Sequence, residues 1–224
     1  MGLCNQEEEI VTKRLIVLTL ALAVVTSVWA DDLNPPTWRG EDDTVFAEWD
    51  FPASDSINPA PYTGPGINDT YLWNEGPWTW YETYAGRQGV WEINGDGGWD
   101  VANYEPSAGG KDIQVQITYY GDFPGMHSFA EDFIPQYVEE TVSLTVDYTE
   151  DAGGGWTYAL LTGEFEIFNP DMEAFFPYNP GGAPPAGGFY VDQIVIDTLH
   201  YSTPEPTTMV LFALGGLIMI RRRK

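Results

Sequence analysis

Acidic side chains are the most numerous groups in this sequence that could do chemistry. Asp42 and Asp43 follow Glu41 in one cluster, and Asp96 and Asp100 lie in and after a glycine-rich stretch. Turns rich in Asp and Gly can bring together the hard oxygen ligands that Ca²⁺ prefers. The four aspartates are therefore candidate calcium ligands, and calcium is the one cofactor that the sequence suggests. Because their spacing differs from that of an EF-hand loop, the alternative is that they are solvated loop residues.

Aromatic side chains are dense between residues 73 and 99, and Trp73, Trp78 and Trp80 are the first tryptophans of this stretch. Trp78 and Trp80 share a face if their segment is a strand, because strand side chains alternate. Exposed rings can stack on the apolar faces of pyranose sugars, so these three residues are candidate sugar-stacking residues. The alternative is ordinary packing, since aromatic residues dominate burial in sandwiches.

Groups for nucleophilic catalysis are scarce. His127 and His200 are the two histidines, and Cys4, the single cysteine, precedes the first apolar run. A Ser-His or Cys-His mechanism would therefore depend on a single candidate base. No G-x-S-x-G, H-E-x-x-H or phosphate-binding glycine loop is present. We expect a non-catalytic protein, and the alternative is a carbohydrate-active enzyme that uses two of the many carboxylates.

The segments that must position these residues alternate as β-strands do. Residues 113–120 and 141–148 alternate apolar with polar side chains, and no part of the body has a sustained 3.6-residue apolar period. Further strands are predicted at Thr44–Trp49, Val90–Ile93, Trp156–Leu161, Glu164–Phe168 and Phe189–Tyr201, with turns at Asn94–Gly98, Ala108–Gly110 and Gly153–Gly155. Many short strands in one chain predict a single all-β domain, a β-sandwich of jelly-roll type, over residues 31–203.

The charge of this body restricts its partners. Between Asp31 and Pro206 there are three cations against 31 acids, a formal charge of −28. Such a body repels nucleic acid phosphates and anionic headgroups, which excludes nucleic acid as a partner.

The N-terminal 30 residues have the organisation of a signal peptide. Lys13 and Arg14 precede the apolar run Leu15–Val28, and Ala30 precedes Asp31. A basic region, an apolar helix and a small residue at the end predict cleavage by signal peptidase between Ala30 and Asp31. Because acids at residues 7–9 are unusual in such a leader, we expect translation to start nearer residues 11–13.

The C-terminal segment, residues 204–224, has three parts. Pro204, Glu205 and Pro206 come first, then 14 uncharged residues from Thr207 to Ile220; four cations end the chain, Arg221, Arg222, Arg223 and Lys224. A helix of that length spans about 20 Å of a bilayer core about 30 Å thick, so we expect a short transmembrane helix with its basic end in the cytoplasm.

In the order and character of its parts, this tail resembles the PEP-CTERM sorting signal of Gram-negative bacteria. The resemblance implies recognition of the Pro-Glu-Pro segment by an exosortase, a membrane-embedded protease thought to act as a transpeptidase. It also implies an inner-membrane intermediate that is later found at the cell surface or outside the cell. The alternative is a permanently anchored envelope protein.

The strand Phe189–Asp197 resembles the closing strand of carbohydrate-binding jelly rolls. This likeness supports the predicted fold. The aromatic residues, which could stack on sugars, make envelope or extracellular polysaccharide the favoured ligand.

Overall fold

A computed structural model describes a body built almost wholly of β-strands. The chain divides into compact units at residues 1–33 and 34–224, and the fold described here is that of the second unit. The described residues are 32–66, 69–74, 76–95, 97–102, 104, 107–122, 128–131, 141–165, 168–169, 172–177 and 189–202. The predicted signal peptide, sorting segment and their helices lie outside these ranges. Among the described residues, no helix has the length and apolar character needed to cross a membrane.

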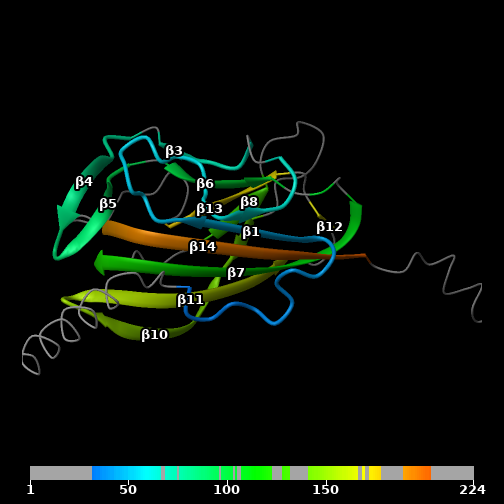
Figure 1. Cartoon of the computed structure of the whole chain (residues 1–224). Helices are drawn as coiled ribbons and strands as arrows, with labels where there is room; N and C mark the ends of the chain where they lie inside the picture. The colour runs from blue at the N-terminus through cyan, green and yellow to red at the C-terminus, as the bar shows by residue number, and fades with distance from the viewer. Residues whose placement is uncertain are drawn as a thin grey trace, which may run out of the picture. The chain divides into compact units, whose positions relative to one another are not determined.

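Nine strands form the larger sheet, in which β14, β7 and β11 lie side by side (Figure 1). The order along its main path is β10-β11-β7-β14-β1-β2; off this path, β5 pairs with β14, β4 pairs with β5, and β12 pairs with β7. The strands of this sheet are β1 (Thr44–Trp49), β2 (Tyr62–Thr63), β4 (Thr79–Tyr84), β5 (Arg87–Ile93), β7 (Ser107–Gly121), β10 (Thr145–Gly153), β11 (Trp156–Phe165), β12 (Phe168–Asn169) and β14 (Phe189–Ser202).

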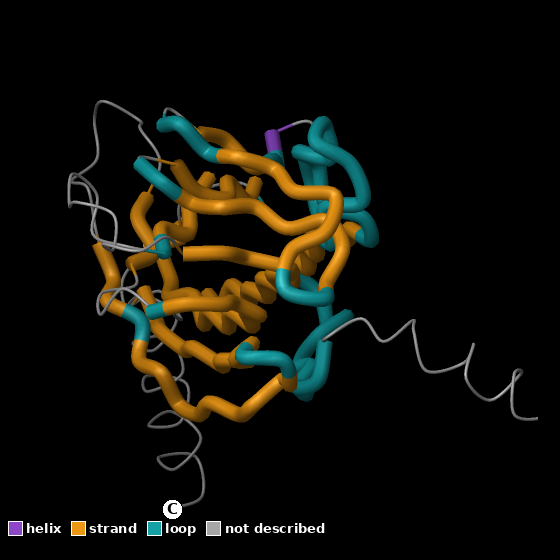
Figure 2. Tube along the Cα trace, turned by 90° about the vertical axis from the view of Figure 1, so that its left-hand side faces the viewer, coloured by secondary structure: helices purple, strands orange, loops and turns teal. Residues whose placement is uncertain are grey.

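A second sheet of five strands has the order β3-β6-β13-β8-β9. Its strands are β3 (Leu72–Asn74), β6 (Gly97–Ala102), β8 (Ser128–Glu131), β9 (Thr141–Ser143) and β13 (Met172–Phe176). Strands make up most of the described trace, and helix is confined to one short segment (Figure 2). The predicted all-β class is therefore confirmed.

One core cluster draws side chains from both sheets. Val115 and Ile196 of the larger sheet and Trp99 and Phe175 of the smaller sheet are all fully buried in it. On β7 the buried core residues are the odd-numbered apolar ones from Ile113 to Tyr119, as the period of two predicts. Two sheets that share one core form a sandwich, which supports the expected resemblance to jelly-roll proteins.

An ion pair crosses this interior. Nζ of Lys111, on β7, lies 3.0 Å and 2.9 Å from the two carboxylate oxygens of Glu173, on β13 of the other sheet. Both side chains are almost completely buried. Burial lowers the pKa of Lys111, and the charge and hydrogen bonds of Glu173 oppose that shift.

A register shift lies near the start of β14. The pairing of β14 with β7 is irregular between Val191 and Gln193. On its other side, β14 pairs with β5 as far as Val191 and with β1 from Ile194 onward. The shift therefore occurs where β14 changes neighbours.

Several strand predictions are confirmed and others are not. The strand at Thr44–Trp49 is found as predicted, and β14 extends the strand predicted from Phe189 by one residue. The segment 141–148 is not one strand, because the chain changes sheets at the buried Leu144. Of the strand predicted at Glu164–Phe168, the first two residues belong to β11 and Phe168 begins β12, while residues 166–167 lie outside the described ranges.

Two of the predicted turns contain glycines that belong to strands. Gly110 lies inside β7, where a Cβ atom would come within 2.1 Å of the Tyr201 hydroxyl oxygen. Gly98 lies in β6, where a Cβ atom would come within 2.5 Å of the Phe175 carbonyl oxygen. Both glycines allow close packing within a strand, which the sequence alone does not distinguish from a turn.

Candidate functional site

The segment just before β1, residues 34–43, lies against the face of the larger sheet that points away from the core; we call it the arm (Figure 1). The Asn34 backbone N–H donates to Oε1 of Gln116 at 2.9 Å, and its side-chain amide donates to the Tyr158 hydroxyl at 3.0 Å. The Gln114 side-chain amide donates to the Asn34 carbonyl oxygen at 2.6 Å. The arm is thus hydrogen-bonded to the middle strands of the sheet.

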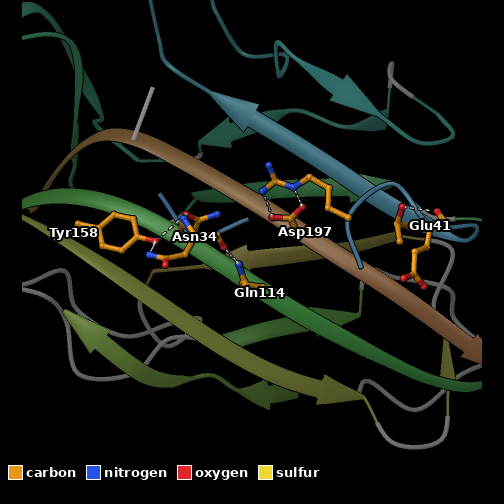
Figure 3. Close-up of polar contacts among 8 residues, drawn as sticks. Asn34, Glu41, Gln114, Tyr158 and Asp197 are labelled. Atoms are coloured by element: carbon orange, nitrogen blue, oxygen red, sulfur yellow. Dashed lines mark hydrogen bonds and ion pairs between the residues drawn. The ribbon is translucent and has the colours of Figure 1, made fainter. Parts of the chain in front are cut away.

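A second attachment holds the arm nearer β1. Arg39 donates through Nε and Nη2 to the two carboxylate oxygens of Asp197, each at 2.6 Å (Figure 3). The Asp197 side chain is completely buried, and the Arg39 guanidinium also lies over the ring of Phe46 at 4.1 Å. Bidentate pairs of this kind fix orientation as well as charge, so Arg39 sets the path of the residues beside it.

A hollow of about 420 Å³ lies beside the arm on this outer face. Its volume is in the range of small-ligand sites. Side chains from the arm and from three adjacent strands line it: Trp38 from the arm, Asp112 and Gln114 from β7, Thr162 and Glu164 from β11, and Thr145 from β10.

Two carboxylates in the hollow are neighbours across strands. Asp112 and Glu164 are directly paired in the β7–β11 register, which brings their Cβ atoms to about 5 Å from each other. Burial raises the pKa of Asp112, and the Glu164 charge raises it further. The Tyr201 hydroxyl donates to Oε1 of Glu164. The Asp112 side-chain carboxylate has no hydrogen bond or ion pair with any other described residue.

Trp38 supplies the aromatic surface of the hollow. It is half-buried and lies in the turn where the Glu41 N–H donates to the Trp38 carbonyl oxygen at 3.0 Å. Its ring makes no contact with another ring of the described part of the chain. One aromatic side chain beside two carboxylates and two threonine hydroxyls is an arrangement that can bind a hydroxyl-bearing ring.

The tryptophans predicted to stack on sugars lie elsewhere. Trp78 is 9% exposed, and its ring packs at 5.8 Å from that of Trp99, so it belongs to the core and cannot stack on a ligand. Trp80 is half-buried against the core and donates to the Phe51 carbonyl oxygen at 3.1 Å. Trp73 is half-buried and donates to Oδ1 of Asp100 at 2.7 Å. The density of aromatic residues here reflects packing for Trp78, as the alternative interpretation held.

The predicted calcium ligands are not gathered in the described ranges. Asp42 and Asp43 are exposed at the start of β1, whereas Asp100 is buried beside Trp73. Asp96 lies outside the described residues. Within the described part of the chain, no group of three or more His, Cys, Asp or Glu side chains could hold a metal ion.

A cluster of tyrosines lies at the far end of the outer face, near the turn between β4 and β5. Tyr84 stacks on Tyr190 with ring centroids 4.0 Å apart and planes 12° apart, and Tyr81 and Tyr120 pack against them. A hydrogen bond with Tyr84, together with burial, raises the pKa of Tyr190. These rings contact one another, which favours a structural role.

The sequence did not predict that the residues of the hollow form a site, although it did predict on which face of its strand one of them lies. The strand at residues 113–120 alternates, so Gln114 could be assigned to the face opposite Ile113. Nothing local indicates that Trp38 lies beside that face, because its position depends on contacts such as Asn34 with Gln116.

The fold and the hollow define an all-β sandwich protein with a polar groove open on one sheet face. Comparison with known families adds the tail: residues 202–224 match the PEP-CTERM protein-sorting motif. The resemblance of the tail is therefore confirmed, and the chain carries a motif that implies export and exosortase sorting at a membrane. No curated protein matches the chain.

Proposed function

We propose that this chain is a non-catalytic surface or extracellular-matrix protein that binds envelope or extracellular polysaccharide through the hollow beside the arm. The observation that carries the proposal is the hollow itself, in which Trp38 faces a row of polar side chains from β7, β11 and β10. Sugars present both an apolar ring face and hydroxyl groups, so a half-buried tryptophan beside carboxylates suits them.

The sorting motif supports a function of the sandwich at the cell surface or outside the cell. The motif begins at residue 202, and β14 ends at Ser202, so the sandwich ends where the sorting segment begins. An exosortase that acts on Pro204–Pro206 would leave every strand of the body in the released protein. The mature product is then a soluble or surface-attached sandwich in contact with the matrix.

Binding can be tested with the full chain in a nonionic detergent. We expect it to be retarded in native gels that contain a neutral β-glucan, and Trp38→Ala to abolish the retardation. Tyr104→Ala is the matched control, because Tyr104 is an exposed aromatic residue outside the hollow. Equal retardation of parent and Trp38→Ala would refute binding in the hollow.

A glycoside hydrolase is the second candidate function, because Asp112 and Glu164 form a cross-strand carboxylate pair in a groove. Retaining hydrolases use two carboxyl groups about 5 Å apart, one with a raised pKa. Release of reducing ends from a bound glucan, lost in both Asp112→Asn and Glu164→Gln, would establish catalysis. Undiminished glucan length during prolonged binding supports the non-catalytic proposal.

Cleavage of the tail is a separate question from ligand binding. We expect the surface form of the protein to lack Arg221–Lys224, because the motif directs processing at the membrane. A mass measurement on the C-terminal peptide decides this. An intact basic end in the surface form would instead favour a permanent anchor.

A further inference from the structure

We propose that the hollow selects an amino sugar with a free, protonated amine, held between Asp112 and Glu164. This inference rests on the proposed function and specifies the class of sugar that the same site takes. It concerns one subsite, bounded by Trp38, Asp112, Gln114, Thr145 and Glu164.

The hollow has several hydrogen-bond acceptors, and few protein donors occupy them. The Asp112 carboxylate receives no hydrogen bond from another described residue, and burial and the charge of Glu164 raise its pKa. Glu164 receives one from the neutral hydroxyl of Tyr201 at Oε1. Gln114 uses its amide N–H toward the arm, so it adds its carbonyl oxygen as a further acceptor. A ligand that fits must therefore donate hydrogen bonds.

The cations of the body are paired with carboxylates other than Asp112 and Glu164. Between Asp31 and Pro206 the only cations are Arg39, Arg87 and Lys111. Arg39 is paired with Asp197, Arg87 with Asp192 and Lys111 with Glu173. Among the described residues, the two carboxylates of the hollow thus have no lysine or arginine paired with them, and a positively charged ligand group would relieve their repulsion.

An ammonium group suits this pair of carboxylates better than a metal ion does. Calcium takes six to eight oxygen ligands, whereas the described residues include no group of three or more His, Cys, Asp or Glu side chains that could hold a metal ion. An ammonium group has three donors and needs only a few acceptors, and charge-assisted hydrogen bonds to carboxylates are short and strong.

The other side chains that line the hollow favour an amino sugar over a lysine side chain. Trp38 provides a flat ring beside the acceptors, and a pyranose has an apolar face that can lie on it. The Thr145 and Thr162 hydroxyls lie within the same lining. Thr162 donates to Oδ2 of Asp147 at 2.9 Å, so its oxygen can accept from a ring hydroxyl. Acidic sugars are disfavoured because the body carries a charge of −28.

The test uses three β-1,4-linked hexasaccharides that differ only at carbon 2, bearing an amine, an acetamide or a hydroxyl group. Titration calorimetry is done at pH 6 and 150 mM salt with the full chain in nonionic detergent. We expect the amine form to bind about tenfold more tightly than the other two. Asp112→Asn with Glu164→Gln should remove that preference and leave weak, equal binding of all three.

A charge-matched double variant controls for attraction by the acidic body as a whole. Asp42→Asn with Glu82→Gln removes the same charge from exposed positions outside the hollow. This control should keep the preference for the amine form. An equal loss of preference in both double variants would overturn the inference.

Two further outcomes separate the inference from the function on which it rests. If all three hexasaccharides bind equally in the parent chain and Trp38→Ala abolishes binding, polysaccharide binding stands and amine selection is wrong. If trilysine binds as tightly as the amine form and Trp38→Ala changes neither, the site is for a cationic peptide and the inference is overturned. Absence of binding by any hexasaccharide would refute both proposals.

Discussion

Lys111 and Glu173 show how single residues connect the two sheets of this protein. They come from different sheets, and their charged groups meet in the interior with almost no exposure. Removing such ions from water costs several kcal/mol each, and their attraction recovers this only when the geometry is good. The pair specifies which parts of the two sheets face each other more than it adds to stability.

Loss of one member of this pair should be severe. We expect Lys111→Met to lower the free energy of unfolding by about 3–5 kcal/mol, because Glu173 is left buried without its cation. Urea denaturation measures the change. Lys111→Met combined with Glu173→Leu should recover most of the loss, since an apolar pair leaves no buried charge. A double variant as unstable as the single variant would contradict this account.

Asp112 gives a pH-dependent prediction. Its folded-state pKa is raised by burial and by Glu164, so the folded protein binds this proton more tightly than the unfolded chain does. The stabilising contribution is complete below the unfolded pKa of about 3.9 and is lost as pH rises through the folded pKa. We therefore expect Asp112→Asn to raise Tm at pH 7 and to leave it unchanged at pH 3. Asp42→Asn, outside the hollow, is the control, and an equal rise at both pH values would contradict the assignment.

At the scale of elements, the approach of β5 to Phe51, two residues after the end of β1, depends on one glycine. Gly89 has a φ of +71°, and a Cβ atom there would lie 2.3 Å from the Phe51 carbonyl oxygen. The same oxygen accepts the Trp80 indole N–H, so the contact joins β4, β5 and the end of β1. No side chain can be accommodated without moving this backbone.

A substitution pair tests that contact. We expect Gly89→Ala to cost about 3 kcal/mol of unfolding free energy, from a left-handed φ and a backbone clash together. Gly86→Asn is the matched control: Gly86 has a φ of +85° with nothing within 4 Å of an added Cβ, and Asn tolerates this conformation. Similar losses in the two variants would show that space at Gly89 is not the cause.

Features that depend on a local sequence pattern could be predicted, whereas features that depend on contacts between distant residues could not. The alternating run around Ile113–Tyr119 identified β7, because one face of that strand meets the core and the other faces the arm. Strand β6 was missed because all six of its residues are buried, which removes the alternation, and because Gly97 and Gly98 resemble a turn. The hollow was missed since it joins Trp38 to residues far along the chain, and only the fold brings them together.

At the scale of the whole molecule, the body ends with β14 and needs all of it. This strand pairs with β7 as far as Ser202 and with β1 as far as Leu199. A chain that ends at Thr203 should therefore keep the parent Tm, whereas one that ends at Asp197 should lose its cooperative unfolding transition. Calorimetry of the two truncated chains measures this, and a cooperative transition in the shorter one would contradict the central role of β14.

The position of β14 also ties the timing of folding to the timing of export. It is the last strand of the body in sequence, yet it lies between β7 and β1 in the larger sheet (Figure 1). In a chain that crosses the membrane amino end first, β1 and β7 have no partner between them until the final residues emerge. Pairing of segments so far apart in sequence is slow, and open strand edges invite pairing with other chains. In an exported chain we therefore expect the sandwich to close only after its last strand has crossed, at the stage when the sorting segment that follows it reaches an exosortase.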